Sequence, residues 1–337
     1  MVDPKSRAQE KRLLADFATY DQHVDVVSAF EWVFTDPGVQ KMPDTVRHFE
    51  RFPHVVSADG VELTPDFTVL FHDGIGIIGE IAKVALREES LDALTTQIGK
   101  YAEVTQLPDE TGHLVDVAHV DVMQIVEMKN GLAAFRRIID ERYLNPDHPY
   151  SPPAPPCVVQ FSRTDTVYAF QRFPDPRNGT LESGDRDPHI QHYLDGDFNP
   201  PIDRFARVKV QRAFINDQID PLYLATHLWA RTWPTQYGAG TDDISVDVNA
   251  TAEILRKQYG VVRAGDVKRA LELLGQVGLA AKEPGGTWVV SRKQLGRSGN
   301  RDVHTLIAAR VGGKARKLVT RRARPPAGPT MDTLFDV

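Results

Sequence analysis

The chain has 337 residues, of which 41% are hydrophobic and 26% charged, a composition typical of a globular protein with room for two domains. No stretch approaches the roughly 18 apolar residues of a membrane span, and the N-terminus has no apolar signal-peptide core. The single cysteine, Cys157, excludes a disulfide framework and a cysteine-based zinc site. Its apolar neighbours predict a buried strand position. We therefore expect a cytoplasmic protein without membrane contacts.

The net charge of −6 is unevenly distributed along the chain. Residues 256–324 contain 17 Lys/Arg and 4 Asp/Glu, a net charge of +13 that leaves −19 for the rest of the sequence. A basic block beside an acidic body is typical of nucleic-acid-binding proteins, because neutralising phosphates requires clustered cations. A solvated basic tail is the alternative interpretation.

The first part of the sequence predicts a mixed α/β domain. Residues 90–104 place Leu91, Leu94, Ile98 and Tyr101 on one stripe, as in an amphipathic helix. Residues 119–127, HVDVMQIVE, alternate like a strand. In chain order we expect a helix over 24–35, a strand near 55–57, a hairpin over 66–82, the helix over 90–104, the strand over 119–127 and a helix over 131–143.

A proline-rich connector, NPDHPYSPPAPP, covers residues 145–156 and is incompatible with regular structure. Two strands, CVVQFSR and TVYAFQRF, follow it. Residues 174–204 are acidic and loop-like. The segment contains His189 and His192, which we interpret as polar loop residues because no third nitrogen or sulfur ligand stands at metal-binding spacing.

A different pattern begins at residue 221. Three expected helices, over 221–231, 249–259 and 264–275, precede a hairpin, LAAKEPGGTWVV, with a glycine-rich turn. Residues 249–290 thus resemble the winged helix-turn-helix family, whose third helix enters the major groove while the wing contacts the DNA backbone. Dimerisation or protein docking is the alternative role of such a module. The resemblance implies that four residues bind DNA, namely Lys268, Arg269, Arg292 and Lys293.

The hairpin over residues 66–82 carries charges that an ordinary buried hairpin avoids. A three-residue loop, His72-Asp73-Gly74, is favoured because Gly74 suits the left-handed position that closes such a turn. Asp66 then faces Glu80 across the strands. A looser five-residue loop ending at Gly76 would shift this pairing by one step. Two carboxylates that face each other repel unless a cation lies between them, and Mg²⁺ suits such a site.

Four motifs in this region resemble those of the PD-(D/E)xK nuclease superfamily. They are Pro65-Asp66, Glu80, Lys83, and the sequence Gln97-Ile-Gly-Lys-Tyr101, which is similar to the QxxxY motif of its exonuclease-like branch. The resemblance covers roughly the first half of the chain. It implies a restriction-endonuclease-like αβββαβ core, to be followed here by the winged helix-turn-helix domain and a basic tail.

The same resemblance implies roles for individual residues. Asp66 and Glu80 would bind Mg²⁺ or Mn²⁺, with the carbonyl of Ile81 and the Glu31 carboxylate as further ligands. Lys83 would orient or deprotonate the attacking water. Gln97 and Tyr101, one helical turn apart, would hold the strand or position the lysine. The chemistry would be metal-assisted phosphodiester hydrolysis.

One departure from the family pattern concerns Lys83, which stands three residues after Glu80 instead of two. Strict alternation along a strand would place the two side chains on opposite faces. A β-bulge at Ile81–Ala82 would restore a common face. Otherwise Lys100 supplies the cation, or the site is impaired.

The C-terminal stretch Met331-Asp-Thr-Leu334-Phe335 follows a Pro/Gly-rich linker. It resembles the short Leu-Phe peptides with which bacterial repair and replication proteins dock on the DNA sliding clamp, although Met331 replaces the usual glutamine. A terminus that packs on its own domain is the alternative.

These features predict a nuclease-like domain over 1–175, an acidic linker over 176–204, a winged-helix domain over 205–295 and a basic tail over 296–337. We expect a Mg²⁺-dependent DNA nuclease, associated with the nucleoid, that acts in restriction, antiviral defence or repair. Cutting both strands with one site per chain would favour a homodimer. The alternatives are an inactive DNA-binding regulator or complex subunit, and an RNA-cleaving enzyme.

Overall fold

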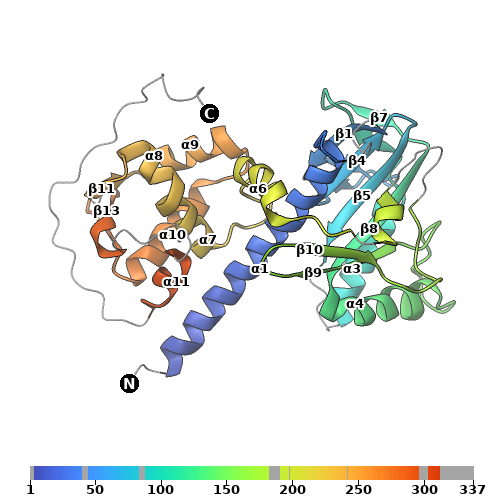
Figure 1. Cartoon of the computed structure of the whole chain (residues 1–337), viewed down its shortest axis with the longest axis horizontal. Coiled ribbons are helices and arrows are strands. Elements are labelled where there is room, and N and C mark those ends of the chain that lie inside the picture. The colour runs from blue at the N-terminus through green and yellow to red at the C-terminus, as the bar shows by residue number, and fades with distance from the viewer. Residues whose placement is uncertain are drawn as a thin grey trace. The chain divides into compact units, whose positions relative to one another are not determined.

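The computed structural model shows a mixed α/β protein that divides into two compact units (Figure 1). It describes residues 4–39, 45–82, 88–181, 190–196, 198–240, 242–295 and 303–311. The sheet unit comprises Asp25–Arg212, and the helical unit combines Met1–Val24 with Ala213–Val337. Helix α1 (Pro4–Thr35) therefore contributes its first part to the helical unit and its second part to the sheet unit.

These units differ from the domains expected from the sequence. Residues 176–204, expected to be a linker, fall within the sheet unit, as does α6 (Ile202–Gln211). Helix α5 (Ile190–Leu194) contributes Ile190 and Leu194 to the core of that unit. The backbone N–H of Phe170 donates to the carbonyl of Phe198, 2.9 Å away, which ties the segment to the sheet. The sequence offered no periodicity there because the contacts are tertiary.

A mixed six-stranded sheet forms the centre of the sheet unit. Its strands are β1 (Val46–Arg51), β4 (Phe67–Phe71), β5 (Ile75–Ile81), β8 (His119–Glu127), β9 (Cys157–Arg163) and β10 (Tyr168–Arg172), in the order β1-β4-β5-β8-β9-β10. The pairs β5–β8 and β8–β9 are parallel and the others antiparallel. Parallel neighbours require crossovers, which α3 (Glu88–Tyr101) and the helical pair α4 (Met128–Phe135) and η1 (Arg136–Tyr143) provide.

The expected strand near residues 55–57 is present, but it lies outside the central sheet, whose first strand along the chain is β1. Val55–Val56 form β2, which pairs with β3 (Glu62–Leu63) in a separate hairpin. Strands β6 (Gln106–Pro108) and β7 (Leu114–Asp116) form another small hairpin. The sequence of β1, VRHFER, lacks a clear apolar face because β1 is an edge strand, where charged residues are common.

Two hydrophobic cores cover the two faces of the sheet. On one face, Phe30 of α1 stacks on Phe67 and meets Phe170 edge-on, with ring centroids 5.3 and 5.0 Å apart. On the other face, the side chains of Ile98 and Tyr101 of α3 pack with Ile78, Val122 and Phe135. Because strand side chains alternate between faces, Ile77 and Ile78 belong to different cores. The sheet unit is therefore a three-layer α/β/α structure, as Figure 1 shows.

The helical unit contains a second, three-stranded antiparallel sheet, whose strands lie in the order β11 (Asp243–Val246), β13 (Trp288–Ser291) and β12 (Ala280–Lys282). Strand β11 was not expected from the sequence; its four residues give too short a pattern. The first part of α1 packs in this unit, where Phe17 stacks on His304 and Tyr20 contacts Tyr223. Its elements are α7 (Pro221–His227), η2 (Leu228–Thr232), α8 (Trp233–Tyr237), β11 (Asp243–Val246), α9 (Val248–Tyr259), α10 (Ala264–Gln276), β12 (Ala280–Lys282), β13 (Trp288–Ser291), η3 (Arg292–Leu295) and α11 (Val303–Ala308).

Helix α9 illustrates how local sequence sets the boundaries of these helices. The Asp247 side chain caps it by accepting the Ala250 N–H at 2.8 Å, and it ends at Gly260, whose φ is 82°. Within the described ranges, no helix is both long and apolar enough to cross a membrane.

Gly79 is required by the packing of Phe67 across the hairpin. A Cβ at Gly79 would overlap the Phe67 ring, which is held between Phe30 and Phe49. We expect Gly79→Ala to lower the free energy of unfolding of the sheet unit by about 1–3 kcal/mol through overpacking. Urea denaturation followed by circular dichroism measures the change.

Gly99→Ala is the matched control, because a Cβ there meets Tyr150 at an ordinary 3.5 Å and Gly99 lies inside α3. This change should leave stability equal or higher, since alanine is the better helix former. Equal effects of the two substitutions would contradict the packing explanation.

The buried His227 side chain should make the helical unit less stable at acidic pH. Its ring contacts those of Phe214 and Tyr259, and burial, with a smaller contribution from Arg231, lowers the pKa of His227 from 6.5 to about 3. Between those values the unfolded state binds a proton that the folded state does not, so stability is lost as the pH falls. We expect a loss of about 2 kcal/mol between pH 7 and pH 5.

Tryptophan fluorescence during urea unfolding reports this loss, because Trp229, Trp233 and Trp288 lie in the helical unit. His227→Gln should flatten the pH dependence, whereas His54→Gln, at an exposed position of the sheet unit, should not. A parent and a His227→Gln variant with the same pH dependence would refute the assignment.

Candidate active site

The β4–β5 hairpin has the register that places Asp66 opposite Glu80. Phe67 pairs with Gly79 and Leu70 with Gly76, so the loop contains three residues and the five-residue alternative is wrong. Gly74 adopts a φ of 79°, and its N–H donates to the Phe71 carbonyl at 3.1 Å. The next step of this register, beyond Phe67 and Gly79, is Asp66 and Glu80.

Asp66 is buried and fixed at the end of β5. Its Oδ2 accepts the backbone N–H of Ile81 at 2.7 Å. Its own carbonyl accepts the N–H of Phe52 at 3.0 Å, which anchors Asp66 to the end of β1 as well. The carboxylate is thereby held beside the last residues of β5.

Glu80 is held by helix α3. The Tyr101 hydroxyl donates to Oε2 at 3.0 Å, and the Gln97 amide donates to Oε1 at 3.3 Å. The same Gln97 amide donates to the Tyr101 hydroxyl at 2.6 Å. Burial, and then the charge of Glu80, raise the pKa of Tyr101, so its hydroxyl remains a donor. The structure therefore brings together Asp66, Glu80, Gln97 and Tyr101.

Gln124 is a further component of the site that sequence reasoning missed. It pairs with Glu80 in the β5–β8 register, and its Nε2 donates to the Glu80 carbonyl at 2.9 Å. The side chain is fully buried, and its Oε1 has no hydrogen-bond partner among the described residues. A buried acceptor without a partner is a group that a bound water or cation satisfies. The signal in the sequence was a single amide side chain in the series of alternate positions of HVDVMQIVE that are otherwise occupied by valine.

Glu31 has a different environment from the one expected. It forms an ion pair with the buried Arg51, and its Oε1 lies 3.8 Å from Nε of Arg212. Arg51 also donates to Ser28 Oγ and to the Arg212 carbonyl, both at 3.0 Å. Among the described residues, no three acidic or histidine side chains gather closely enough to ligate one metal. Glu31 therefore does not complete such a group with Asp66 and Glu80.

The described part of β5 contains no bulge. Its register with β8 continues without a shift through Ile81–Ile125, and the Ala82 N–H donates to the Ile125 carbonyl at 2.9 Å. Ile81 and Ala82 pack against the cores on opposite faces, as in a regular strand. Of the alternatives for Lys83, the β-bulge at Ile81–Ala82 is therefore ruled out. Lys83 itself lies outside the described residues.

Two other residues were expected to contribute to the site. Lys100 lies in the last turn of α3, and Ile81 is the last residue of β5. No contact in the described part of the chain joins Lys100 to either carboxylate. Instead, Lys100 helps to lower the pKa of Asp59, an effect dominated by the hydrogen bond from Ser57. The Ile81 carbonyl belongs to the same residue as the N–H that binds Asp66, so it also lies at the end of β5.

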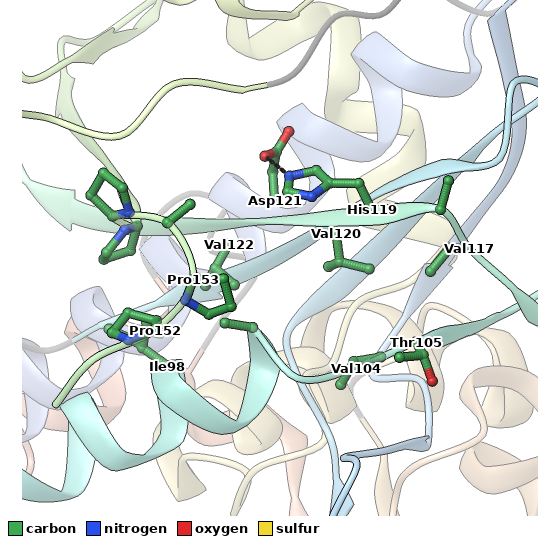
Figure 2. A pocket seen from close by; sticks show the side chains of 15 residues that line it. Ile98, Val104, Thr105, Val117, His119, Val120, Asp121, Val122, Pro152 and Pro153 are labelled. Atoms are coloured by element: carbon green, nitrogen blue, oxygen red, sulfur yellow. Dashed lines mark hydrogen bonds and ion pairs between the residues drawn. The ribbon is translucent and has the colours of Figure 1, made fainter. Parts of the chain in front are cut away.

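A cavity of about 170 Å³ lies at the other end of the β5–β8 pair (Figure 2). Val120 and Val122 point into it, and Pro152 and Pro153 form a wall. The His119 Nε2 lies 2.8 Å from Asp121 Oδ1 on the opposite side of the strand. Because His119 pairs with Ile75, five positions before Glu80, this cavity is separate from the carboxylate pair.

The expected DNA-binding residues differ in accessibility. The Lys268 side chain is 60% exposed and lies 3.8 Å from Glu272, and Lys293 is also exposed. Arg269 forms an ion pair with Asp266 inside the first turns of α10. Arg292 is buried and donates to the carbonyls of Gly238 and Asp242, at 2.7 and 3.1 Å. Its guanidinium thus holds the loop before β11.

Some expected residues cannot be compared with the structure. His189 and the C-terminal residues Met331, Leu334 and Phe335 lie outside the described residues. His192 is on α5, where its ring contacts Tyr193. Docking on a sliding clamp therefore stays a prediction.

Two carboxylates, a phenol and two carboxamides thus converge at one end of the sheet. Oxygen donors of this kind suit a hard divalent cation such as Mg²⁺. Comparison with protein-family models, curated proteins and solved structures finds no match to this chain. The functional conclusion therefore depends on the geometry.

The contact between Tyr101 and Glu80 can be measured by a double-mutant cycle. Tyr101→Phe removes a hydroxyl that donates to a charged acceptor, so we expect a loss of about 1–3 kcal/mol in the free energy of unfolding. In a Glu80→Gln background the loss should be smaller, with a coupling energy of about 0.5–3 kcal/mol. Urea denaturation of the four proteins gives the cycle.

Tyr143→Phe is the control, because Tyr143 lies in the same unit and its hydroxyl forms no hydrogen bond with the described residues. Its effect should be independent of Glu80. Additive effects of Tyr101→Phe and Glu80→Gln would show that the hydroxyl does not hold the carboxylate.

Proposed function

We propose that the sheet unit is a divalent-metal-dependent phosphodiester hydrolase. The supporting observation is the Asp66–Glu80 pair at adjacent strand ends, each carboxylate oriented by its own hydrogen bonds. Facing carboxylates repel, and a divalent cation between them removes the repulsion. Mg²⁺ binds one or two carboxylates and takes its remaining ligands from water and phosphate oxygens. The donor set fits this ion.

More specifically, we propose a DNA nuclease of the PD-(D/E)xK type. The order α1, β1, β4, β5, α3, β8 resembles the αβββαβ core of that superfamily. Asp66 and Glu80 would correspond to its metal-binding acids, and Gln97 and Tyr101 to its QxxxY motif. The contact of both motif residues with Glu80 supports the match, because it gives the motif a physical role.

The residues of this chain would act mainly by positioning. Asp66, Glu80 and the Ile81 carbonyl would hold Mg²⁺ or Mn²⁺, which when bound polarises the phosphate and lowers the pKa of its water. Tyr101 and Gln97 hold the Glu80 carboxylate, and Gln124 holds the main chain of Glu80. Groups fixed before the reaction require no reorganisation during it. Lys83, or Lys100 in its place, would supply the cation that orients the attacking water.

The helical unit supports duplex DNA as the substrate. The succession of α7, β11, α9, α10 and the β12–β13 hairpin, with β11 paired to β13, resembles a winged helix-turn-helix. In that family α10 would enter the major groove and the hairpin would contact the backbone. Lys268 on α10 and Lys293 after β13 are the exposed cations that suit these contacts. Cutting both strands would require two copies of the single site.

Cleavage assays test the proposal. Plasmid and linear DNA are incubated with Mg²⁺, Mn²⁺ or EDTA, together with the parent, Asp66→Asn and Glu80→Gln. We expect metal-dependent cleavage by the parent and a loss of at least about 10²–10³-fold in rate for each variant, the scale set by removal of one electrostatic catalytic group. Product length on denaturing gels gives the rate.

Asp73→Asn is the matched control, because Asp73 lies at the far end of the same hairpin and binds the Ile75 N–H. It should cleave like the parent. Cleavage unchanged in both site variants would refute the assignment. A parent inactive with both metals would favour the non-catalytic DNA-binding regulator, and cleavage of RNA but not DNA would favour the RNA-cleaving alternative.

A further inference from the structure

Helix α6 carries a basic stripe that the proposed hydrolysis does not use. The α6 stripe consists of Arg204, Arg207 and Gln211, which lie at positions i, i+3 and i+7 and therefore share one face of the helix. All three side chains are exposed. In the described part of the chain, neither arginine forms an ion pair or a hydrogen bond. Two guanidinium groups thus face solvent one helical turn apart.

Buried contacts on its other face fix α6 to the sheet unit. Phe205 is fully buried in the core, and Lys209, four residues later, places Nζ 2.6 Å from Asp25 Oδ1. Asp25 is completely buried and also accepts from the Tyr168 hydroxyl at 2.9 Å, with Arg163 at 3.4 Å. Breaking such a buried pair is strongly unfavourable, so the rotation of α6 about its axis is fixed.

The C-terminal end of α6 adjoins the strand end that carries the carboxylates. Helix α6 lies in the layer of α1, whereas the Glu80 side chain faces α3. Arg51, the last residue of β1, donates from Nη1 to the carbonyl of Arg212, directly after α6. The next residue, Phe52, donates its N–H to the carbonyl of Asp66. Two hydrogen bonds therefore connect the C-terminal end of α6 to Asp66 through β1. Figure 1 also shows the arrowhead of β5 directed toward the side of the sheet unit where α6 lies.

We propose that the α6 stripe binds the sugar-phosphate backbone of the nucleic acid beside the Asp66–Glu80 pair. Arginine suits this role because its planar guanidinium binds phosphate oxygens bidentately, and glutamine also contacts phosphates. The spacing of one helical turn lets two long side chains reach neighbouring phosphates of one strand. A helix that is already fixed loses little freedom on binding. The inference rests on the proposed function for the identity of the substrate.

The salt dependence of DNA binding tests this role separately from catalysis. A labelled duplex is titrated with the full chain carrying Glu80→Gln, with and without Arg204→Gln and Arg207→Gln, and anisotropy is measured between 50 and 200 mM salt. Loss of two phosphate contacts should reduce the slope of log K against log salt by about 1.8 and weaken binding roughly 60-fold at 0.1 M salt. Each single variant should reduce the slope by about 0.9.

Arg136→Gln is the matched control, since Arg136 is an exposed arginine of η1 in the opposite layer; its slope should equal that of the background. Arg204→Lys with Arg207→Lys should retain the slope. An unchanged slope in the double glutamine variant, or no duplex binding by the background, would overturn the inference. A parent that fails to cleave while the slope still falls would overturn the proposed hydrolysis and leave the α6 contact standing.

Discussion

The pairing of Asp66 with Glu80 across one tight hairpin is the constraint on which the site depends. It requires the left-handed Gly74 in the loop, because a longer loop would shift the register. It requires Gly79, which leaves room for the Phe67 ring beside the carboxylates. It also requires α3, since Gln97 and Tyr101 orient Glu80 from the neighbouring layer. Loop, strand packing and helix position therefore converge on one pair of side chains.

Two other acidic side chains, Asp25 and Glu31 of α1, have structural roles. Asp25 is neutralised by Lys209 and Arg163, and these contacts hold α6 and β9 to α1. Glu31 is neutralised by Arg51, which also binds the end of α6. A buried charge must be paired, so these acids fix the architecture and are poor candidates for metal ligands. Amide and hydroxyl groups are among the partners of Asp66 and Glu80, and such donors orient a carboxylate without neutralising it.

Local signals in the sequence predicted part of this arrangement. The loop glycine fixed the expected register of the hairpin, and helical spacing placed Gln97 and Tyr101 on one face. Tertiary contacts defined the rest: β1 reads as VRHFER because it is an edge strand, and α1 is one helix whose two parts belong to different units. Gln124 could not be assigned a role without knowing that β8 lies beside β5. No local pattern reveals such a neighbour.

The distribution of positive charge shows why net charge alone is a poor guide to phosphate contacts. Within the basic stretch over 256–324, Arg269 is paired with Asp266 and Lys257 with Glu253, while Arg292 binds backbone carbonyls. Each of these cations is already used inside the helical unit. Arg204 and Arg207 lie outside that stretch, and both are exposed on a fixed helix. Because a phosphate needs an accessible cation, exposure and existing partners decide which residues can bind DNA, and Arg204 and Arg207 meet both criteria.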